Sequence, residues 1–321
     1  MKVGYFLSCE ELAPRELLDR ARAAERAGFA GLWISDHYHP WLEAQGNSPF
    51  VWSMIGALSQ VTTLPITTGV TCPTLRIHPA VIAQAAATSS VLLEGRFTLG
   101  VGSGEALNEH ILGGVWPSAD VRLEMLEEAV HVIRRLWTGE QVEHRGAHYT
   151  VENARVYTLP DTPPPVFVSG FGPKAIDLAA RIGDGFCLVS PDGEAVARFR
   201  DHGGADKTVQ AGTKVCYGED AAACRRTAHR LWPNDVLPGE LPQVLPTPSH
   251  FEQATTLVTE EMVAEAVVCG PDPEAHVAHL RQFAQAGVDE LFVQQVGSDD
   301  ASFFDAYRDR VLPAVQQERH R

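Results

Sequence analysis

The stretch KVGYFLSCEELAPRELLDRARAAERAGFAGLWIS (residues 2–35) decides the fold. Residues 2–7 and 30–35 are short runs rich in apolar residues, typical of buried strands, and residues 14–28 between them have the apolar spacing of an amphipathic helix. A proline near the start of this helix and a glycine just past its end stand where these residues are favoured. The pattern predicts two parallel strands joined by a crossover helix.

The same alternation of strand and helix continues along the chain. Further strand-like runs are expected at residues 65–72, 96–102, 164–170, 185–190, 213–218 and 290–296. Helical segments are expected at residues 52–62, 79–93, 121–137, 173–183, 193–203, 220–232, 260–268, 273–287 and 303–316. Eight strands that alternate with helices favour a closed α/β barrel, the (β/α)8 or TIM barrel, which takes about 250 residues before insertions. We therefore expect one domain of this class over residues 1–321.

Two stretches interrupt this alternation. Residues 138–160 combine short alternating runs with turn-forming residues, which is typical of a β-hairpin. Residues 233–257 contain five prolines and little periodicity, which predicts a long loop over the surface. Long loops of compact domains are often functional lids, so this segment is a candidate for part of a substrate pocket.

The composition argues against several classes of function. The net charge is −15, and lysines and arginines nowhere form a dense cluster, so nucleic-acid binding is not expected. Neither a run of 18 apolar residues nor a signal-peptide pattern is evident, which predicts a cytoplasmic protein without a membrane segment. The six cysteines are scattered without C-x-x-C spacing and are expected to be reduced.

Polar residues gather just after the predicted strands, where the reactive groups of such barrels lie. The second strand leads into SDHYHPW (residues 35–41), and His37 is the candidate general base because histidine titrates near neutral pH. Alternatively, His37 or His39 only hydrogen-bonds the loop. A metal site formed by Asp36, His37 and His39 is a weaker alternative, because the spacing is not i, i+4 and no further ligand is evident.

Two glycine-rich segments follow later strands. In GVGSGEALNEH (residues 100–110), Ala106 stands where a dinucleotide fingerprint needs its last glycine, and no helix is expected directly after the turn, so that fingerprint is rejected. Glu105 is then a candidate general acid, or else a helix cap or a solvated charge. SGFGPK (residues 169–174) precedes a helix, whose free N–H groups, with Lys174, favour a phosphate site over a simple tight turn.

These motifs resemble those of the F420-dependent glucose-6-phosphate dehydrogenase family, within the luciferase-like group of barrels. The similarity runs over nearly the whole chain and is densest in SDHYHPW, HPAVIAQAAAT (residues 78–88), LGVGSGEALNE (99–109), RLWTGEQVEHRGAHY (135–149) and DPEAHVAHL (272–280). Several separate motifs in the same order make the resemblance specific. It implies a bacterial luciferase-like TIM barrel that binds coenzyme F420, a deazaflavin, and forms a homodimer.

The resemblance also implies roles for single residues. Asp36 would contact the deazaflavin edge, and His37 would take the proton of the substrate hydroxyl. Trp41 would stack beside the reacting centre, and Glu105 would act as an acid toward the deazaflavin. The family has a non-proline cis peptide against the ring, which corresponds here to Gly69–Val70. The remaining cofactor contacts would be Thr71, Cys72, Ser103, Gly104, Ala106, Asn108 and, around the phosphate, Ser169, Gly170, Phe171 and Gly172.

The substrate positions depart from the family pattern. The two lysines that hold the sugar phosphate in the family correspond to Asp192 and Glu265, and its arginine to Ala301 or Ser302. Negative charges would repel a phosphate, so glucose 6-phosphate is not the expected substrate. The expected reaction is hydride transfer between the deazaflavin and a CH–OH or carbonyl carbon of another alcohol or sugar, neutral or more hydrophobic. The alternatives are an FMN-dependent luciferase-like monooxygenase and a non-catalytic flavin-binding barrel.

Overall fold

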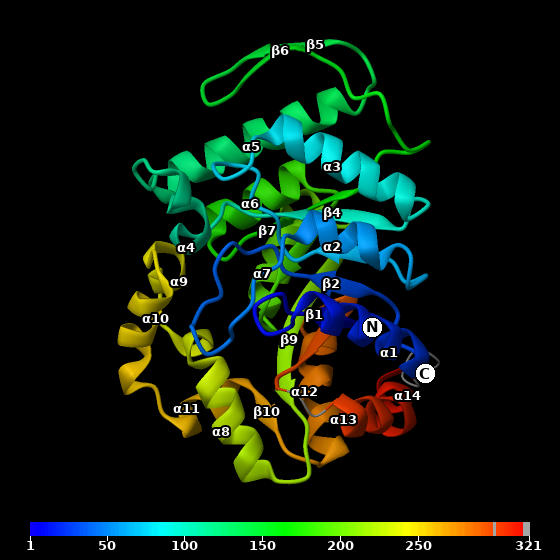
Figure 1. The fold of residues 1–321 in the computed structure, drawn as a ribbon, viewed down its shortest axis with the longest axis vertical. Helices are drawn as coiled ribbons and strands as arrows, with labels where there is room; N and C mark the ends of the chain where they lie inside the picture. The colour runs from blue at the N-terminus through cyan, green and yellow to red at the C-terminus, as the bar shows by residue number, and fades with distance from the viewer. Residues whose placement is uncertain (298–299, 317–321) are drawn as a thin grey trace.

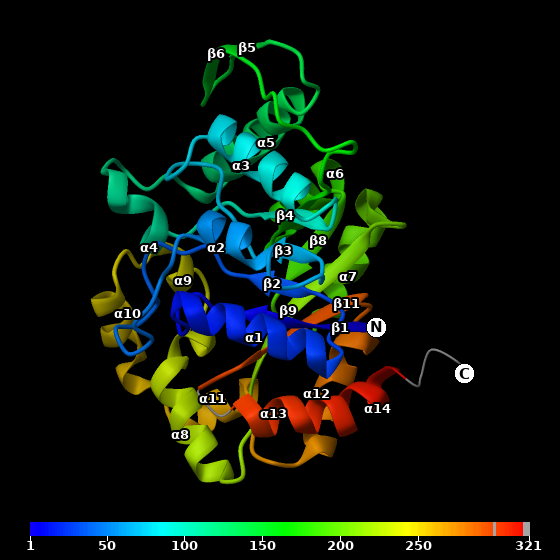
Figure 2. The same ribbon diagram turned by 45° about the vertical axis from the view of Figure 1, so that its right-hand side comes forward.

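Eight parallel strands form a closed barrel at the centre of the molecule, and helices surround it (Figure 1 and Figure 2). The computed structural model describes residues 1–297 and 300–316. In ring order the strands are β1 (Lys2–Leu7), β2 (Leu32–Ile34), β3 (Ile66–Thr68), β4 (Phe97–Val101), β7 (Val166–Ser169), β8 (Gly185–Leu188), β9 (Thr208–Cys216) and β11 (Glu290–Gln295). Pairing of β8 with β9 closes the ring, which confirms the predicted barrel.

The helices that cover the barrel begin where the sequence offers a helix-starting residue. Several have proline in the first turn, which its fixed φ and missing N–H favour, and others have an aspartate cap. The covering helices are α1 (Pro14–Ala27), α2 (Val51–Leu58), α3 (Pro79–Leu92), α5 (Ala119–Leu136), α6 (Pro173–Ile182), α7 (Gly193–Phe199), α8 (Ala221–Leu231), α11 (Glu260–Ala266), α12 (Pro273–Gln285), α13 (Asp300–Ala306) and α14 (Leu312–Gln316). After α7 the chain kinks within Arg200–Gly204, where His202 and Gly203 have non-helical dihedral angles. A single π-helical turn (Tyr307–Val311) joins α13 to α14.

Side chains fill the barrel interior in layers, because every second residue of a strand points inward. Trp33 stacks on Phe292 with ring centroids 5.2 Å apart, and its indole Nε1 donates to Gln210 Oε1 at 2.8 Å. Gly212 leaves room for the same indole, since a Cβ at that position would lie 2.9 Å from the ring. The interior is therefore a packed core, and the polar residues of the site lie above it at the C-terminal ends of the strands.

Three segments differ from the predicted elements. Strand β9 begins at Thr208 instead of residue 213, because the polar Gln210 is buried and paired with Trp33, which local composition does not reveal. A further strand, β10 (Val268–Cys269), pairs with the end of β9. Residues 233–257 are a chain of short helical turns and not an irregular loop, because three of the prolines start turns. These turns are Pro233–Val236, α9 (Leu241–Val244), α10 (Pro248–Ala254) and Thr255–Leu257.

The predicted hairpin is confirmed. Strands β5 (Val142–Arg145) and β6 (Thr150–Ala154) pair antiparallel and lie over α5, outside the ring of helices, at the top of Figure 1. All six cysteines are free thiols. In the part of the chain that the structure describes, no helix is long and apolar enough to cross a membrane.

Candidate active site

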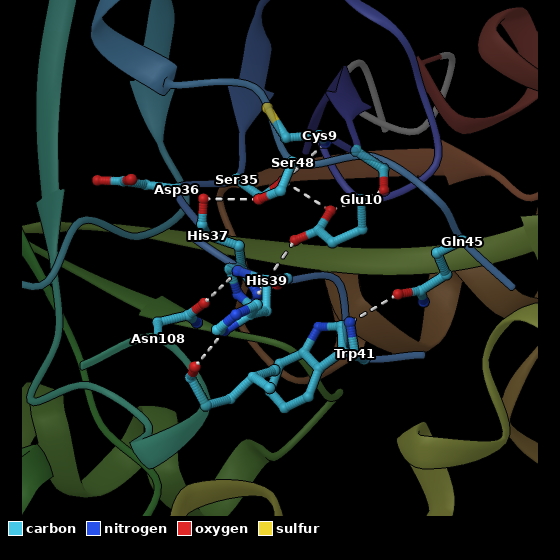
Figure 3. A network of polar contacts seen from close by, with 12 residues as sticks. Cys9, Glu10, Ser35, Asp36, His37, His39, Trp41, Gln45, Ser48 and Asn108 are labelled. Carbon is cyan, nitrogen blue, oxygen red and sulfur yellow. Dashed lines mark hydrogen bonds and ion pairs between the residues drawn. The ribbon is translucent and has the colours of Figure 1, made fainter. Parts of the chain in front are cut away.

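His37 lies between two carboxylates at the C-terminal end of the barrel. Figure 3 shows one of them, Glu10, beside the His37 ring. Its Nδ1 is 3.6 Å from Glu10 Oε1, and its Nε2 is 3.7 Å from Glu105 Oε2. Both distances exceed a hydrogen bond, but each carboxylate is close enough to stabilise a protonated imidazole. Nδ1 also lies 3.3 Å from the His39 carbonyl oxygen. The Glu10 side chain is 3% exposed and that of Glu105 31%, so Nδ1 faces the protein and Nε2 the open side of the site.

Glu10 is a member of this site that the sequence motifs did not identify. It follows β1, and its Oε2 accepts hydrogen bonds from the hydroxyls of Ser8 and Ser35, both at 2.8 Å. These bonds hold a buried carboxylate beside His37. A signal was available, because Glu10 follows the first predicted strand as His37 follows the second.

The second histidine of the loop makes different contacts. His39 Nδ1 bonds to the Leu107 carbonyl oxygen at 2.9 Å, and the His39 backbone N–H donates to Asn108 Oδ1 at 3.2 Å. Hydrogen bonds to Leu107 and Asn108 therefore explain the position of His39. His37 is the histidine that faces the carboxylates.

Asp36 points away from His37 and is held by the protein (Figure 3). Its Oδ1 accepts from Arg76 Nη2 and its Oδ2 from Thr71 Oγ1, both at 2.8 Å. Arg76, which the motifs also did not identify, bonds Glu109 through its backbone N–H at 2.6 Å. Burial raises the pKa of Glu109, and Arg76 opposes that shift. Within residues 1–297 and 300–316 no three potential metal ligands cluster, and the pairing of Asp36 with Arg76 weighs against the metal alternative.

Glu105 is positioned by a short helix, α4 (Ala106–Glu109), which begins directly after it. The expectation that no helix follows this turn was wrong, because Asn108 stabilises the turn with its side chain. Asn108 Oδ1 accepts from the Tyr38 backbone N–H at 2.8 Å, and its Nδ2 donates to Glu105 Oε2 at 3.1 Å. Glu105 occupies the N-cap position, yet its side chain makes no capping hydrogen bond. The Glu105 carboxylate is therefore directed toward Asn108 and His37.

Trp41 forms an apolar wall beside His37. The rings of Trp41 and His37 are 5.0 Å apart, and Trp41 packs edge to face on Phe251 at 5.1 Å. Phe251 lies in α10, so the proline-rich segment 233–257 reaches the site. The apolar cluster at this point consists of Leu42, Leu107 and Phe251, with Trp41, Leu237 and Leu245 packed against it.

Small residues gather where β3 and β4 end. The Gly69–Val70 peptide bond is cis, as expected. Gly104 has a φ of +86°, and a Cβ there would lie 2.5 Å from Cys72 Sγ, so glycine is required. Burial raises the pKa of the Cys72 thiol well above its usual range, which keeps the thiol neutral. These segments after β3 and β4 form one wall of the site and contain the predicted cofactor contacts Val70, Thr71, Cys72, Ser103, Gly104 and Ala106.

The glycine-rich loop after β7 leads directly into α6, as predicted. Gly172 is the N-cap of this helix, and a Cβ on Gly170 would lie 2.8 Å from the backbone of Ala175. Lys174 is engaged elsewhere, because its Nζ bonds both carboxylate oxygens of Asp120, at 2.8 and 2.9 Å. A phosphate at Ser169, Gly170, Phe171 and Gly172 would therefore depend on backbone N–H groups and not on Lys174.

The positions that correspond to the family's phosphate-binding residues offer no cationic side chain. Asp192 is the N-cap of α7 and accepts from the Ala195 backbone N–H at 2.9 Å. Glu265 is exposed on α11, and Ala301 is exposed on α13. None of these three residues therefore supplies a positive charge for a substrate phosphate.

Fold and site together define a (β/α)8 barrel with a histidine that lies between two carboxylates and beside an aromatic wall. The family model of luciferase-like monooxygenases matches residues 1–290. The F420-dependent glucose-6-phosphate dehydrogenase of Beutenbergia cavernae is 35% identical over 98% of both chains. A solved F420-dependent secondary alcohol dehydrogenase, in complex with an F420-acetone adduct, is 30% identical over 98% of this chain and 99% of its own, with a TM-score of 0.91.

The coenzyme F420 dependent tetrahydromethanopterin reductase of Methanopyrus kandleri shares the fold, with 18% identity and a TM-score of 0.79 over 98% of this chain and 100% of its own. The protein belongs to the luciferase-like family. Within it, the protein belongs to the family of the F420-dependent glucose-6-phosphate dehydrogenases, as the motifs predicted.

Proposed function

We propose that this protein is a coenzyme F420-dependent oxidoreductase that oxidises an uncharged alcohol, or reduces the corresponding ketone, with His37 as the general base. The observation that carries the proposal is the position of His37 between Glu10 and Glu105, where the imidazole can accept a proton and have its charge stabilised. The 35% and 30% identical relatives, both F420-dependent dehydrogenases, support the same activity.

The wall where β3 and β4 end is the proposed place of the flat ring, because Cys72 adds no charge there. Gly102 and Gly104 let the side chains of Val70 and Cys72 pack against the backbone of this wall. The loop before α6 suits a phosphate. The bound deazaflavin supplies two-electron hydride chemistry with little reaction toward oxygen. The proposed cofactor contacts are Asp36, Gly69, Val70, Thr71, Cys72, Ser103, Gly104, Ala106, Asn108, Ser169, Gly170, Phe171 and Gly172.

His37 Nε2 takes the proton of the substrate hydroxyl. The contact of Nδ1 with the His39 carbonyl oxygen favours the tautomer in which Nδ1 carries the hydrogen and Nε2 is free to accept. Glu10 then stabilises the imidazolium from one side and Glu105 from the other. Trp41 excludes water from one side of the ring, which strengthens both attractions. The reverse sequence delivers the proton to a carbonyl oxygen.

The substrate we propose is a small, uncharged secondary alcohol. Two carboxylates flank His37, so an anionic group would be repelled. The family resemblance supports the same expectation, since it places Asp192 and Glu265 where the family has lysines. Trp41, Leu237 and Leu245, the partly exposed members of this apolar cluster, offer contact to alkyl groups. The secondary alcohol dehydrogenase with its acetone adduct supports this substrate class.

Titration of the purified protein with coenzyme F420 and, separately, with FMN tests the cofactor through intrinsic tryptophan fluorescence. We expect tight binding of F420 and no tight binding of FMN. Addition of 2-propanol should then reduce the absorbance of the oxidised cofactor. A preference for FMN would overturn the assignment in favour of a monooxygenase. Tight F420 binding without turnover of any alcohol would favour a non-catalytic flavin-binding barrel.

The family resemblance also supports a homodimer in the cytoplasm. Light scattering on the purified protein should give the mass of two chains. The mass of a single chain at micromolar concentration would contradict the dimer without affecting the catalytic assignment.

A further inference from the structure

Lys214 projects into the barrel mouth from the C-terminal end of β9. Side chains alternate along a strand, so residues 210, 212 and 214 share one face. Gln210 bonds the interior indole of Trp33, and a Cβ on Gly212 would meet the same indole, so this face is the interior one. Lys214 is the next residue on that face, at the end of the barrel where His37 lies.

The ammonium group of Lys214 is paired within the protein. Its Nζ lies 2.9 Å from Asp235 Oδ2 and 3.1 Å from Asp235 Oδ1, and 4.0 Å above the ring of Trp232. Asp235 belongs to the proline-rich segment, in the turn Pro233–Val236. The side chains of Lys214 and Asp235 are 19% and 22% exposed, so water screens the pair only in part.

The same residues are linked to the catalytic loop. Trp232 Nε1 donates to Glu11, which is adjacent to Glu10 in the chain. Gln45 Nε2 donates to the Leu231 carbonyl oxygen at 2.8 Å, and Gln45 Oε1 accepts from the Trp41 backbone N–H at 2.8 Å. Trp41 also packs against the apolar cluster that contains Trp232. The Lys214–Asp235 pair therefore lies on the same side of the site as Trp41.

We propose that the Lys214–Asp235 pair determines substrate charge, because Asp235 neutralises a lysine that would otherwise attract anionic substrates into the pocket. The inference rests on the proposed dehydrogenase function and adds the residues that set its preference for uncharged substrates. A free ammonium group in a partly buried pocket attracts a phosphate or carboxylate strongly, and an adjacent carboxylate cancels that attraction. The neutralised pair leaves the flanking carboxylates Glu10 and Glu105 to repel anions.

A purely mechanical role makes a different prediction. If the pair only fastened residues 233–257 to the barrel, loss of Asp235 would lower turnover of all substrates together. If the pair sets substrate charge, loss of Asp235 should change the ratio between an anionic and a neutral substrate. The ratio of kcat/KM for glucose 6-phosphate to that for 2-propanol separates these roles.

The experiment compares wild type with Asp235→Asn, which removes one charge at nearly constant shape. We expect the ratio to rise at least tenfold. In the double variant Lys214→Met/Asp235→Asn the gain should disappear, because no cation remains to attract the anion. Glu127→Gln is the matched control, since it frees an arginine, Arg181, on the outer surface between α5 and α6 and should leave the ratio unchanged.

A second measurement is independent of turnover. Titration with inorganic phosphate, followed by tryptophan fluorescence because Lys214 covers Trp232, should show at least tenfold tighter binding to Asp235→Asn than to wild type. Equal phosphate affinities would overturn the proposal. So would a parallel loss of turnover on both substrates, or efficient use of glucose 6-phosphate by wild type. If neither protein oxidises any alcohol but the phosphate affinities differ as expected, the dehydrogenase assignment fails and the role of the pair stands. Asp235→Ser provides a second test if Asp235→Asn does not fold.

Discussion

Two sets of charged groups, one at each end of the barrel interior, are held differently. At the N-terminal end, Glu290 accepts from Lys2 Nζ at 2.7 Å and from Gln210 Nε2 at 2.8 Å. At the C-terminal end, the nitrogens of His37 lie 3.6 and 3.7 Å from the carboxylates of Glu10 and Glu105. Hydrogen bonds satisfy the first set, whereas the second set is close enough for electrostatic attraction but is not joined by hydrogen bonds.

This difference separates stability from function. Paired groups and stacked rings at the N-terminal end resist rearrangement, so substitutions there should lower the free energy of unfolding. The reactive residues of such barrels lie at the C-terminal end, so substitutions there should lower turnover. The following predictions test this division from the largest expected effect to the smallest.

His37→Ala should reduce kcat with the preferred alcohol by about 10²- to 10⁴-fold, because the proton acceptor is removed. The loss of F420 absorbance during turnover measures the effect, and the thermal unfolding midpoint should change little. His202→Ala is the control, since this histidine lies on the outer surface and pairs with Asp177. Unchanged turnover in His37→Ala would show that His37 is not the base.

Phe292→Ala should lower the free energy of unfolding by about 3–5 kcal/mol, because it removes the ring stacked on Trp33 and leaves a cavity in the barrel. Urea unfolding followed by circular dichroism gives the value. The kcat of the folded fraction should stay within about twofold of wild type, which is under 0.5 kcal/mol. A large loss of kcat in a stably folded variant would contradict the separation of the two ends.

The smallest effect concerns His279 on α12, which bonds to Thr213 Oγ1 at 2.8 Å between the barrel wall and the outer helices. Burial lowers its pKa from 6.5 to about 4. The unfolded chain takes up a proton near pH 6.5 and the folded protein only near pH 4, so stability should fall as the pH decreases through this window. The decrease should reach at most about 3 kcal/mol.

Urea unfolding of wild type and His279→Gln at pH 7 and pH 5 measures how much His279 contributes to this loss of stability. The variant should lose less stability than wild type between the two pH values, while its turnover at pH 7 is preserved. Identical pH dependence in both proteins would show that His279 contributes nothing to the acid sensitivity.

Much of the fold followed from local patterns. Eight strands, the covering helices and the hairpin were predictable because strand and helix have different hydrophobic periods that can be recognised within a few residues. The start of β9 was not predictable, because Gln210 is buried only through its bond to Trp33, a residue far away in the chain. The helical turns of residues 233–257 were missed because each is too short to show a period.

The sequence by itself determined the barrel and the group of residues that follow its strands, including His37, Trp41 and Glu105. Only the tertiary structure showed that His37 and not His39 faces the carboxylates, that Arg76 holds Asp36, and that Asp235 neutralises Lys214. The physical reason is one of range. Periodicity and helix caps act between residues a few positions apart, whereas charge pairing and burial depend on distances in space between segments that the chain places far apart.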